Sequence, residues 1–275
     1  MKDQIIRAIE AVRTASPLVH SITNFVVMNV TANALLAAHA SPLMAHAAEE
    51  MDDITDIDAA LVLNIGTLDP SWLESMELAG KLMRAKGKPV VLDPVGAGAS
   101  RLRTEASLRL LDMVRPQIVR GNASEIMALA SEIRRAERLP SSSAGTPASK
   151  GVDSLNDSRD AVDSASLLAE RFGCVVSISG QRDFISDGKT VLTVDGGSPL
   201  MPLITGMGCS ASAVTGAYAA CSEPLVAAAA AMAVFASAGE KAAKKAAGPG
   251  TFLPHFLDEL YAVDSEDAAV RVKML

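Results

Sequence analysis

Aromatic residues are scarce in this chain, and acidic residues outnumber basic ones. The sequence holds one Trp, two Tyr and six Phe, and its 32 Asp and Glu against 25 Lys and Arg give a formal net charge of −7. Proteins that bind nucleic acid carry a basic surface and often use aromatic side chains to stack on bases. We therefore expect no nucleic-acid partner.

Cysteine is also rare, and no targeting segment stands out. Cys174, Cys209 and Cys221 show neither CxxC nor metal-ligand spacing, which argues against a disulfide framework. The first 14 residues mix charges with apolar residues at helical spacing and contain no unbroken apolar run of the kind found in signal peptides. These features favour a cytoplasmic protein.

Two segments are apolar enough to raise the question of a membrane. Residues 16–48 carry no Asp, Glu, Lys or Arg, but several Asn, His39 and Pro42 interrupt them, so we interpret them as a buried helix plus a binding loop. The Ala-rich run 225–236 is short and is followed by lysines, which predicts a core helix with a solvated basic end. We expect no membrane partner.

The pattern along the chain predicts an α/β fold. Four short apolar runs that end in glycine or a polar residue predict buried parallel strands, and the segments between them are long enough for crossover helices. Asp187-Gly188 is a hairpin turn signal that predicts an antiparallel element. The strands are expected at 61–66, 89–96, 117–122, 174–180, 183–186 and 190–195, and the helices at 71–85, 104–113, 158–172, 209–220, 225–245 and 252–261.

A single domain accounts best for the whole chain, residues 1–275. Its 49% hydrophobic content is enough for a large core. Residues 138–157 are rich in Ser and poor in apolar side chains, and we interpret them as a surface loop. Because the strand at 174–180 resumes the same alternation, the loop is an insertion within one domain rather than a linker.

Residues 205–212 carry the most informative local signal. Gly206 and Gly208 run directly into a helical pattern of small residues that begins at Cys209. A glycine-rich turn at the start of a helix exposes backbone N–H groups that can bind an anion such as phosphate. Alone the signal is weak, because two glycines before a helix are often ordinary turn residues.

Polar groups follow each predicted parallel strand, where ligands bind in open α/β sheets. They are Asp93, Arg120, Glu125 and Ser179, and Asn122 with Glu125 has the spacing of a helix capping box. Each has an ordinary structural explanation as a cap or an ion-pair partner. Together they supply what phosphoryl transfer to an alcohol requires: a cation for phosphate, hard carboxylates for Mg²⁺ and backbone amides for an anion. The sequence contains no Walker A motif.

Seven segments resemble the hydroxyethylthiazole kinases, which belong to the ribokinase-like superfamily. The resemblance covers nearly the whole chain and implies a three-layer α/β/α sandwich with a mostly parallel central sheet. It also implies a phosphotransferase that uses ATP and Mg²⁺ to phosphorylate the primary hydroxyl of 4-methyl-5-(2-hydroxyethyl)thiazole in thiamine biosynthesis or salvage, as a homotrimer with active sites between subunits. The segments are 17–24, 40–44, 64–67, 92–95, 120–125, 206–209 and 248–252.

The resemblance also suggests roles for individual residues. Met44, Gly206 and Asn24 would contact the thiazole, and Arg120 and Ser179 would bind ATP, with Ser179 standing where many relatives have Thr. Asp93 and Glu125 would lie on the metal side. Gly206, Gly208 and Cys209 would form the catalytic turn. Met207 stands where relatives often carry a smaller residue or Thr.

Cys209 departs from the Asp that many ribokinase-like enzymes use to accept the proton of the attacking hydroxyl. A thiolate base is conceivable, but the charge of ATP opposes ionisation, and the loose transition state requires little early proton removal. We therefore expect Cys209 to help by position. The alternatives are a kinase of another small alcohol, such as hydroxymethylpyrimidine, a nucleotide-repair dehydratase, or a sensor. We assign His20 and His46 no catalytic role.

Overall fold

One mostly parallel sheet forms the centre of the molecule. The computed structural model describes residues 1–140 and 155–275, and it describes the side chains of residues 1–140 and 160–275. The strand order is β2-β1-β3-β4-β5-β6-β7-β8-β9. Pairing is parallel from β2 to β6 and antiparallel from β6 to β9. The strands are β1 (Leu18–Ile22), β2 (Ser41–Leu43), β3 (Ala60–Asn64), β4 (Val90–Asp93), β5 (Ile118–Asn122), β6 (Val175–Ser179), β7 (Arg182–Ser186), β8 (Val191–Asp195) and β9 (Val272–Met274).

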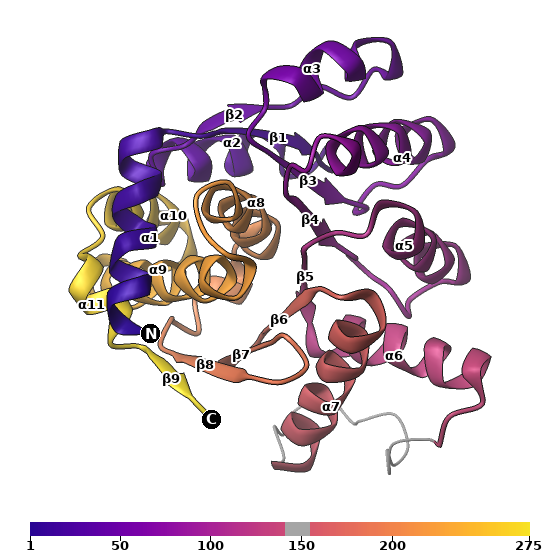
Figure 1. Cartoon of the computed structure of the whole chain (residues 1–275). Coiled ribbons are helices and arrows are strands. Elements are labelled where there is room, and N and C mark those ends of the chain that lie inside the picture. Colours follow the sequence, from indigo (N-terminus) through magenta and orange to yellow (C-terminus); the bar gives the residue numbers. More distant parts are fainter. Residues whose placement is uncertain (141–154) are drawn as a thin grey trace.

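Helices cover both faces of this sheet, and Figure 1 shows the three layers. One face carries α1 (Lys2–Ala15), α2 (Met28–Ala37), α8 (Met207–Ala219), α9 (Pro224–Lys245), α10 (Pro249–Tyr261) and α11 (Ser265–Ala269). The other carries α3 (Met51–Ile57), α4 (Pro70–Ala85), α5 (Arg101–Val114), α6 (Ala123–Glu137) and α7 (Leu155–Phe172). Short 3₁₀ turns lie at Ala48–Glu50 and Met201–Leu203. The predicted α/β/α sandwich is confirmed.

The helices begin where the sequence supplies caps. Asp69 accepts hydrogen bonds from the first amides of α4, and Ser100 does the same for α5. Asn122 and Glu125 form the predicted capping box at the start of α6, with each side chain accepting the other residue's backbone N–H. Since β5 ends where α6 begins, this box fixes the turn at the edge of the sheet.

Helices α8 and α9 pack closely because most of their buried residues are small. Gly216 lets α8 approach the sheet so closely that a Cβ there would lie 2.5 Å from a Val62 methyl group. By length and composition α9 could cross a membrane, yet 78% of its apolar window is buried inside the fold. The prediction of a core helix at this position is confirmed.

Three strands were missed by the sequence analysis. Residues 16–48, interpreted as a helix plus a loop, contain β1, α2 and β2. Strand β1 was missed because the buried polar residues His20 and Ser21 interrupt its apolar run. The third missed strand, β9, is short and largely exposed, and it leaves the C-terminal region less purely helical than expected. Of the predicted loop 138–157, residues 141–154 lie outside the described part, while α7 already begins at Leu155.

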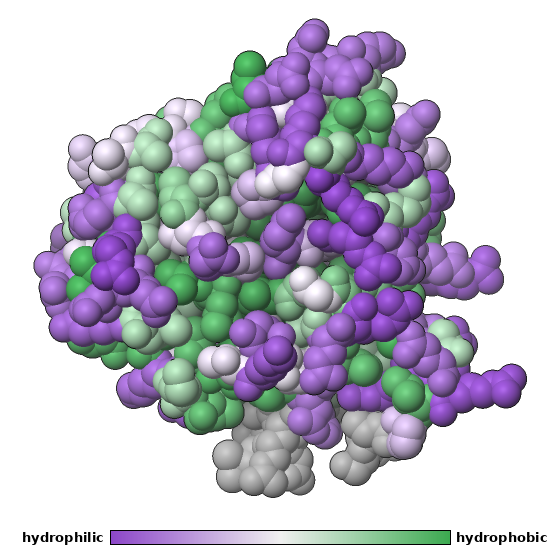
Figure 2. All heavy atoms as spheres, in the orientation of Figure 1, coloured by the Kyte–Doolittle hydropathy of each residue, from purple (hydrophilic) through white to green (hydrophobic). Residues whose placement is uncertain are grey.

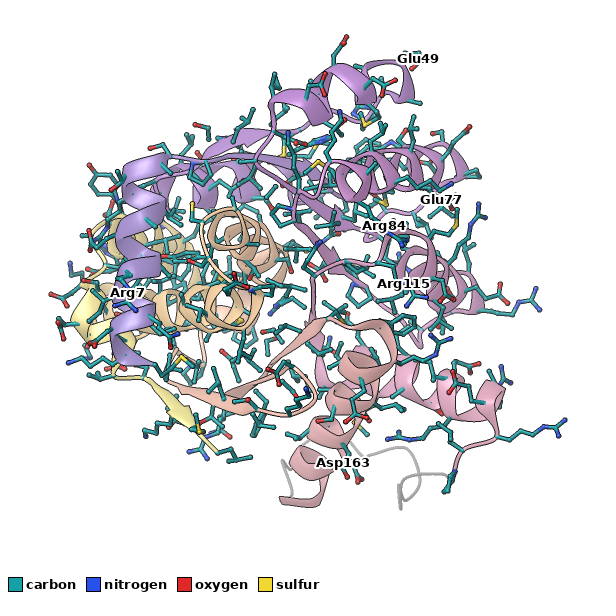
Figure 3. The ribbon with its side chains drawn as sticks, viewed as in Figure 1. Arg7, Glu49, Glu77, Arg84, Arg115 and Asp163 are labelled. Atoms are coloured by element: carbon teal, nitrogen blue, oxygen red, sulfur yellow. The ribbon has the colours of Figure 1, made fainter. Side chains whose placement is uncertain are left out.

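The visible face of the molecule is not uniform in polarity. In the view of Figure 2, the α3 to α7 side is mostly hydrophilic, and hydrophobic atoms gather over the α8 and α9 side. Figure 3 places charged side chains such as Arg7 on α1 and Asp163 on α7 well away from the central sheet. The charged side chains buried within the sheet layer are therefore the exceptions to be explained.

Candidate active site

The carboxyl ends of β3, β4, β5 and β6 bring the predicted polar residues together. Asn64 pairs with Asp93 across β3 and β4, and Asn122 pairs with Ser179 across β5 and β6. Arg120 lies two residues before the end of β5. The start of α8, which packs against β3 and β4, covers this edge. Parallel pairing thus produces the cluster that the sequence analysis expected.

A chain of buried hydrogen bonds runs along this edge. Asn24 Nδ2 donates to Asn64 Oδ1 at 2.8 Å, Asn64 Nδ2 donates to Asp93 Oδ2 at 2.7 Å, and Ser212 Oγ donates to the same oxygen at 2.8 Å. The backbone N–H of Gly66 also donates to Asn64 Oδ1, at 3.0 Å. Because a backbone N–H can only donate, it fixes the orientation of the Asn64 carboxamide and directs the amide nitrogen to Asp93.

The carboxyl group of Asp93 is buried, which disfavours its charged form. Burial raises its pKa to about 6, opposed by the positive charge of Arg120 and reinforced by the negative charge of Glu125. Both hydrogen bonds to Asp93 end on Oδ2, so within the described residues Oδ1 accepts none. Asp93 is 2% exposed and does not line the cavity described below, so its charge is compensated from within the fold.

Arg120 lies against the start of α8. The buried guanidinium donates from Nη1 to the carbonyl oxygen of Gly208 at 3.0 Å, and its Nε has no partner among the described residues. A Cβ on Gly208 would lie 2.9 Å from Nη1. Gly206 has φ 86°, a left-handed conformation that favours glycine. The turn therefore lets a cation lie directly against the positive end of a helix.

Cys209 lies between this turn and Asn24. Its Sγ accepts a hydrogen bond from Asn24 Nδ2 at 3.6 Å. Burial, and then the negative charge of Asp93, raise the pKa of the Cys209 thiol to about 11. At neutral pH the side chain is therefore a thiol, which opposes a thiolate base and supports a positioning role.

A cavity of about 900 Å³ opens beside Arg120. Both residues predicted to bind ATP, Arg120 and Ser179, line it, and so does Gly208. Asn24, Met44 and Cys209 do not line it. Met44 follows β2, on the far side of β1 from the centre of the sheet, and packs against the hydrophobic core. The predicted residues thus divide into a cavity side and an Asn24 side, with the start of α8 between them.

Glu125 is held by the main chain. Its Oε1 accepts from the N–H of Gly96 at 2.9 Å, and its Oε2 accepts from the N–H of Asn122 at 2.8 Å. The described residues contain no group of three or more His, Cys, Asp or Glu side chains suited to a metal ion. Glu125 therefore serves the turn between β5 and α6, and its negative charge reaches Asp93 from there.

Comparison with known proteins identifies the family. The hydroxyethylthiazole kinase family model matches residues 9–266. The chain belongs to the hydroxyethylthiazole kinase family. It is 52% identical to a hydroxyethylthiazole kinase of Nitratidesulfovibrio vulgaris, over 99% of this chain and 97% of that protein. It is 50% identical to a hydroxyethylthiazole kinase of Brachyspira hyodysenteriae, over 99% and 98%.

Solved structures agree with the fold of a hydroxyethylthiazole kinase. The hydroxyethylthiazole kinase of Pyrococcus horikoshii OT3 superposes with a TM-score of 0.86 at 40% identity, covering 99% of both chains. A pyridoxal kinase from Staphylococcus aureus reaches a TM-score of 0.59 at 19% identity, covering 82% of this chain and 88% of that one, which shows a shared fold. The expected family and the expected ribokinase-like architecture are confirmed.

Three polar residues of the candidate site were not singled out from the sequence. Asn64 links Asn24 to Asp93, and Ser212 holds Asp93 from α8. Asp183, which lines the cavity, accepts a hydrogen bond from the N–H of Gly180 at 2.9 Å, and burial raises its pKa to about 6. Asn64 was detectable as the polar end of a buried strand, whereas only the fold brings Ser212 and Asp183 near.

Replacing Asp93 with Asn should stabilise the ligand-free protein at neutral pH. The folded-state pKa of about 6 exceeds the unfolded value of roughly 3.9, so the folded protein binds more protons between these values and loses stability as pH rises through that window. The introduced carboxamide cannot ionise, and its oxygen can accept the same two hydrogen bonds. We expect D93N to exceed the wild type by about 2–3 kcal/mol at pH 7 in urea unfolding.

The dependence on pH provides the control for this prediction. At pH 4 both proteins hold a neutral side chain at position 93, so the difference in unfolding free energy should shrink toward zero. Asp183 titrates in the same range in both proteins and cancels in the difference. A stability difference that stays the same at pH 4 and pH 7 would contradict a buried charge at Asp93.

Removing the thiol of Cys209 should slow turnover without abolishing it. We expect Cys209→Ala to lose less than about a thousandfold in kcat, a deficit of roughly 4 kcal/mol, because a protonated thiol contributes packing and a weak hydrogen bond. Steady-state ADP release measures the effect, and Cys221→Ala, just beyond the other end of α8, is the matched control. A larger loss of kcat in a folded variant would indicate that Cys209 acts as a thiolate base.

Proposed function

We propose that this protein transfers the γ-phosphoryl group of ATP to the primary hydroxyl of 4-methyl-5-(2-hydroxyethyl)thiazole. The observation that carries the proposal is the junction at the start of α8, where Arg120 and the glycine turn face the cavity and Cys209 faces Asn24. In this proposal the phosphoryl group passes between the two substrates at this junction. Full-length similarity to hydroxyethylthiazole kinases supports the choice of acceptor.

In this mechanism the chain's residues bind and align the two substrates. Arg120 and Ser179 hold the phosphates of ATP in the cavity, and the amides at the start of α8 stabilise the charge on the transferred group. Asn24, Met44 and Gly206 hold the thiazole so that its hydroxyl points at the γ-phosphorus. Cys209 packs beside the alcohol. Because the transition state is loose, alignment and charge stabilisation supply most of the rate.

Mg²⁺ would bind beside Asp93 in this mechanism. The carboxylate is a hard oxygen ligand whose Oδ1 accepts no hydrogen bond from the described residues, and a nearby cation would offset the cost of its buried charge. Bound there, Mg²⁺ would shield the negative charge of the phosphates. Glu125, with both oxygens accepting backbone N–H groups, would act mainly through its charge or through water.

The chain works, in this proposal, as a single cytoplasmic kinase domain that assembles into a homotrimer. Phe25 and Val26 are 60% and 68% exposed beside Asn24, and Leu203 is 63% exposed shortly before Gly206. Apolar side chains this exposed next to a site suit coverage by another subunit. Light scattering should give a mass near three times 28.5 kDa, and a monomer at assay concentration would contradict the assembly.

The activity is tested by ADP release from Mg-ATP with different acceptors. We expect turnover with hydroxyethylthiazole only, and its loss in Arg120→Ala, because that variant removes the buried guanidinium at the phosphate site. Turnover with hydroxymethylpyrimidine instead would show that the acceptor is a different alcohol. ADP release that requires neither acceptor would favour a dehydratase, and absence of ADP release would favour a sensor.

A further inference from the structure

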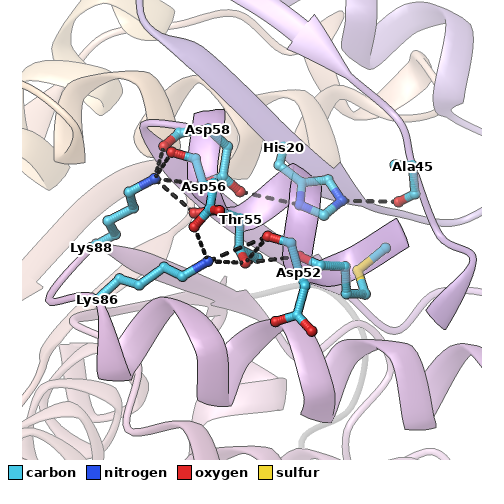
Figure 4. A network of polar contacts seen from close by, with 9 residues as sticks. His20, Ala45, Asp52, Thr55, Asp56, Asp58, Lys86 and Lys88 are labelled. Atoms are coloured by element: carbon cyan, nitrogen blue, oxygen red, sulfur yellow. Dashed lines mark hydrogen bonds and ion pairs between the residues drawn. The ribbon is translucent and has the colours of Figure 1, made fainter. Parts of the chain in front are cut away.

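His20 is a fully buried histidine outside the catalytic set described above. It lies in the middle of β1, with Nε2 3.0 Å from the carbonyl oxygen of Ala45 and Nδ1 3.3 Å from Oδ2 of Asp58, which Figure 4 shows as the two ends of one imidazole ring. A carbonyl oxygen can only accept a hydrogen bond, so Nε2 is the donor in the contact with Ala45.

The second contact requires one more proton. With Nε2 protonated, Nδ1 of a neutral ring is an acceptor and would face an acceptor oxygen of an ionised Asp58. A hydrogen bond between Nδ1 and Asp58 Oδ2 therefore requires one more proton, carried either by the ring or by the carboxyl group. The charged groups around it are Lys88, whose Nζ lies 3.5 Å from Asp58 Oδ1, and then Lys86 and Asp56.

The contact with Ala45 holds a segment next to the proposed substrate site. Pairing between β1 and β2 ends at His20 and Leu43, so Met44, Ala45 and His46 extend beyond the strand ladder. Among the described residues, the bond from His20 is the only hydrogen bond that this three-residue segment makes. The segment is otherwise held by packing, which includes the ring of His46 on Trp72 with centroids 4.8 Å apart.

We propose that His20 is a positioning residue that holds Met44 in place for the thiazole through the carbonyl group of Ala45, and that Asp58 keeps the ring in the donating state. The inference rests on the proposed function, in which Met44 contacts the acceptor. His20 touches neither substrate. Loss of its bond would free the segment on the acceptor side and leave the ATP cavity intact, because none of these residues lines that cavity.

Two amide variants separate the roles of the two ring nitrogens. A Gln amide can occupy the position of Nε2 and donate to Ala45, whereas the shorter Asn amide reaches only the position of Nδ1. We expect His20→Asn to raise the KM for hydroxyethylthiazole by about tenfold or more, with kcat and the KM for ATP within about threefold of wild type, because only binding of the acceptor is weakened. His20→Gln should stay within about threefold for all three constants.

The outcomes distinguish this inference from the proposed function. If the wild type fails to phosphorylate hydroxyethylthiazole, the proposed function fails. If the wild type is active and His20→Asn leaves the KM for thiazole unchanged, or raises the KM for ATP equally, the positioning role is overturned. Circular dichroism and thermal unfolding establish that each variant is folded.

Asp58→Asn provides a second test should His20→Asn not fold. The amide introduced at position 58 can donate to Nδ1 of a neutral imidazole and keep Nε2 protonated without an additional proton. Asp58→Asn should therefore keep the KM for thiazole within about threefold of wild type, whereas Asp58→Leu, which offers Nδ1 no hydrogen-bond partner, should raise it about tenfold, with the KM for ATP unchanged in both. Equal KM values for thiazole in Asp58→Leu and Asp58→Asn would overturn the role of Asp58.

Discussion

The site depends on keeping one carboxylate buried at the edge of the sheet. Asp93 has a pKa near 6 because burial disfavours its charge, and the fold offsets part of that cost with two hydrogen bonds and with Arg120. Asn64 donates reliably because the amide of Gly66 fixes its orientation. The carboxylate therefore has little freedom to turn toward solvent. Because folding has already desolvated this charge, a cation bound beside it, as proposed for Mg²⁺, would not have to provide that cost again.

Residues whose role is local could be predicted from the sequence. Asn122 and Glu125 have the spacing of a capping box, and the box forms as expected because it depends only on the first turn of α6. Apolar runs also predicted the central strands, since a strand buried on both faces is hydrophobic throughout. Because these strands pair in parallel, their carboxyl ends lie at the same edge of the sheet, and Asp93, Arg120 and Ser179 come together there.

Residues whose role depends on distant partners were not predictable in the same way. His20 and Ser21 interrupt the apolar pattern of β1, and His20 is tolerated there only because Asp58 and Ala45, 38 and 25 residues away, supply its hydrogen bonds. Ser212 resembles any other small residue of α8 until packing of that helix against β4 brings it to Asp93. Glu125 was predicted on the metal side, but both of its carboxylate oxygens accept hydrogen bonds from backbone N–H groups.

The buried Asp93 also gives a physical reason for the cysteine at position 209. The negative charge of Asp93 is already felt there, since it helps to raise the pKa of the thiol to about 11. A second carboxylate at the start of α8 would add like-charge repulsion to the burial cost, and a rise in its own pKa would follow. A neutral thiol avoids this cost and still accepts the hydrogen bond from Asn24. In the proposed mechanism, the positive potential of the turn would then act on the phosphoryl group, because no side-chain charge neutralises it.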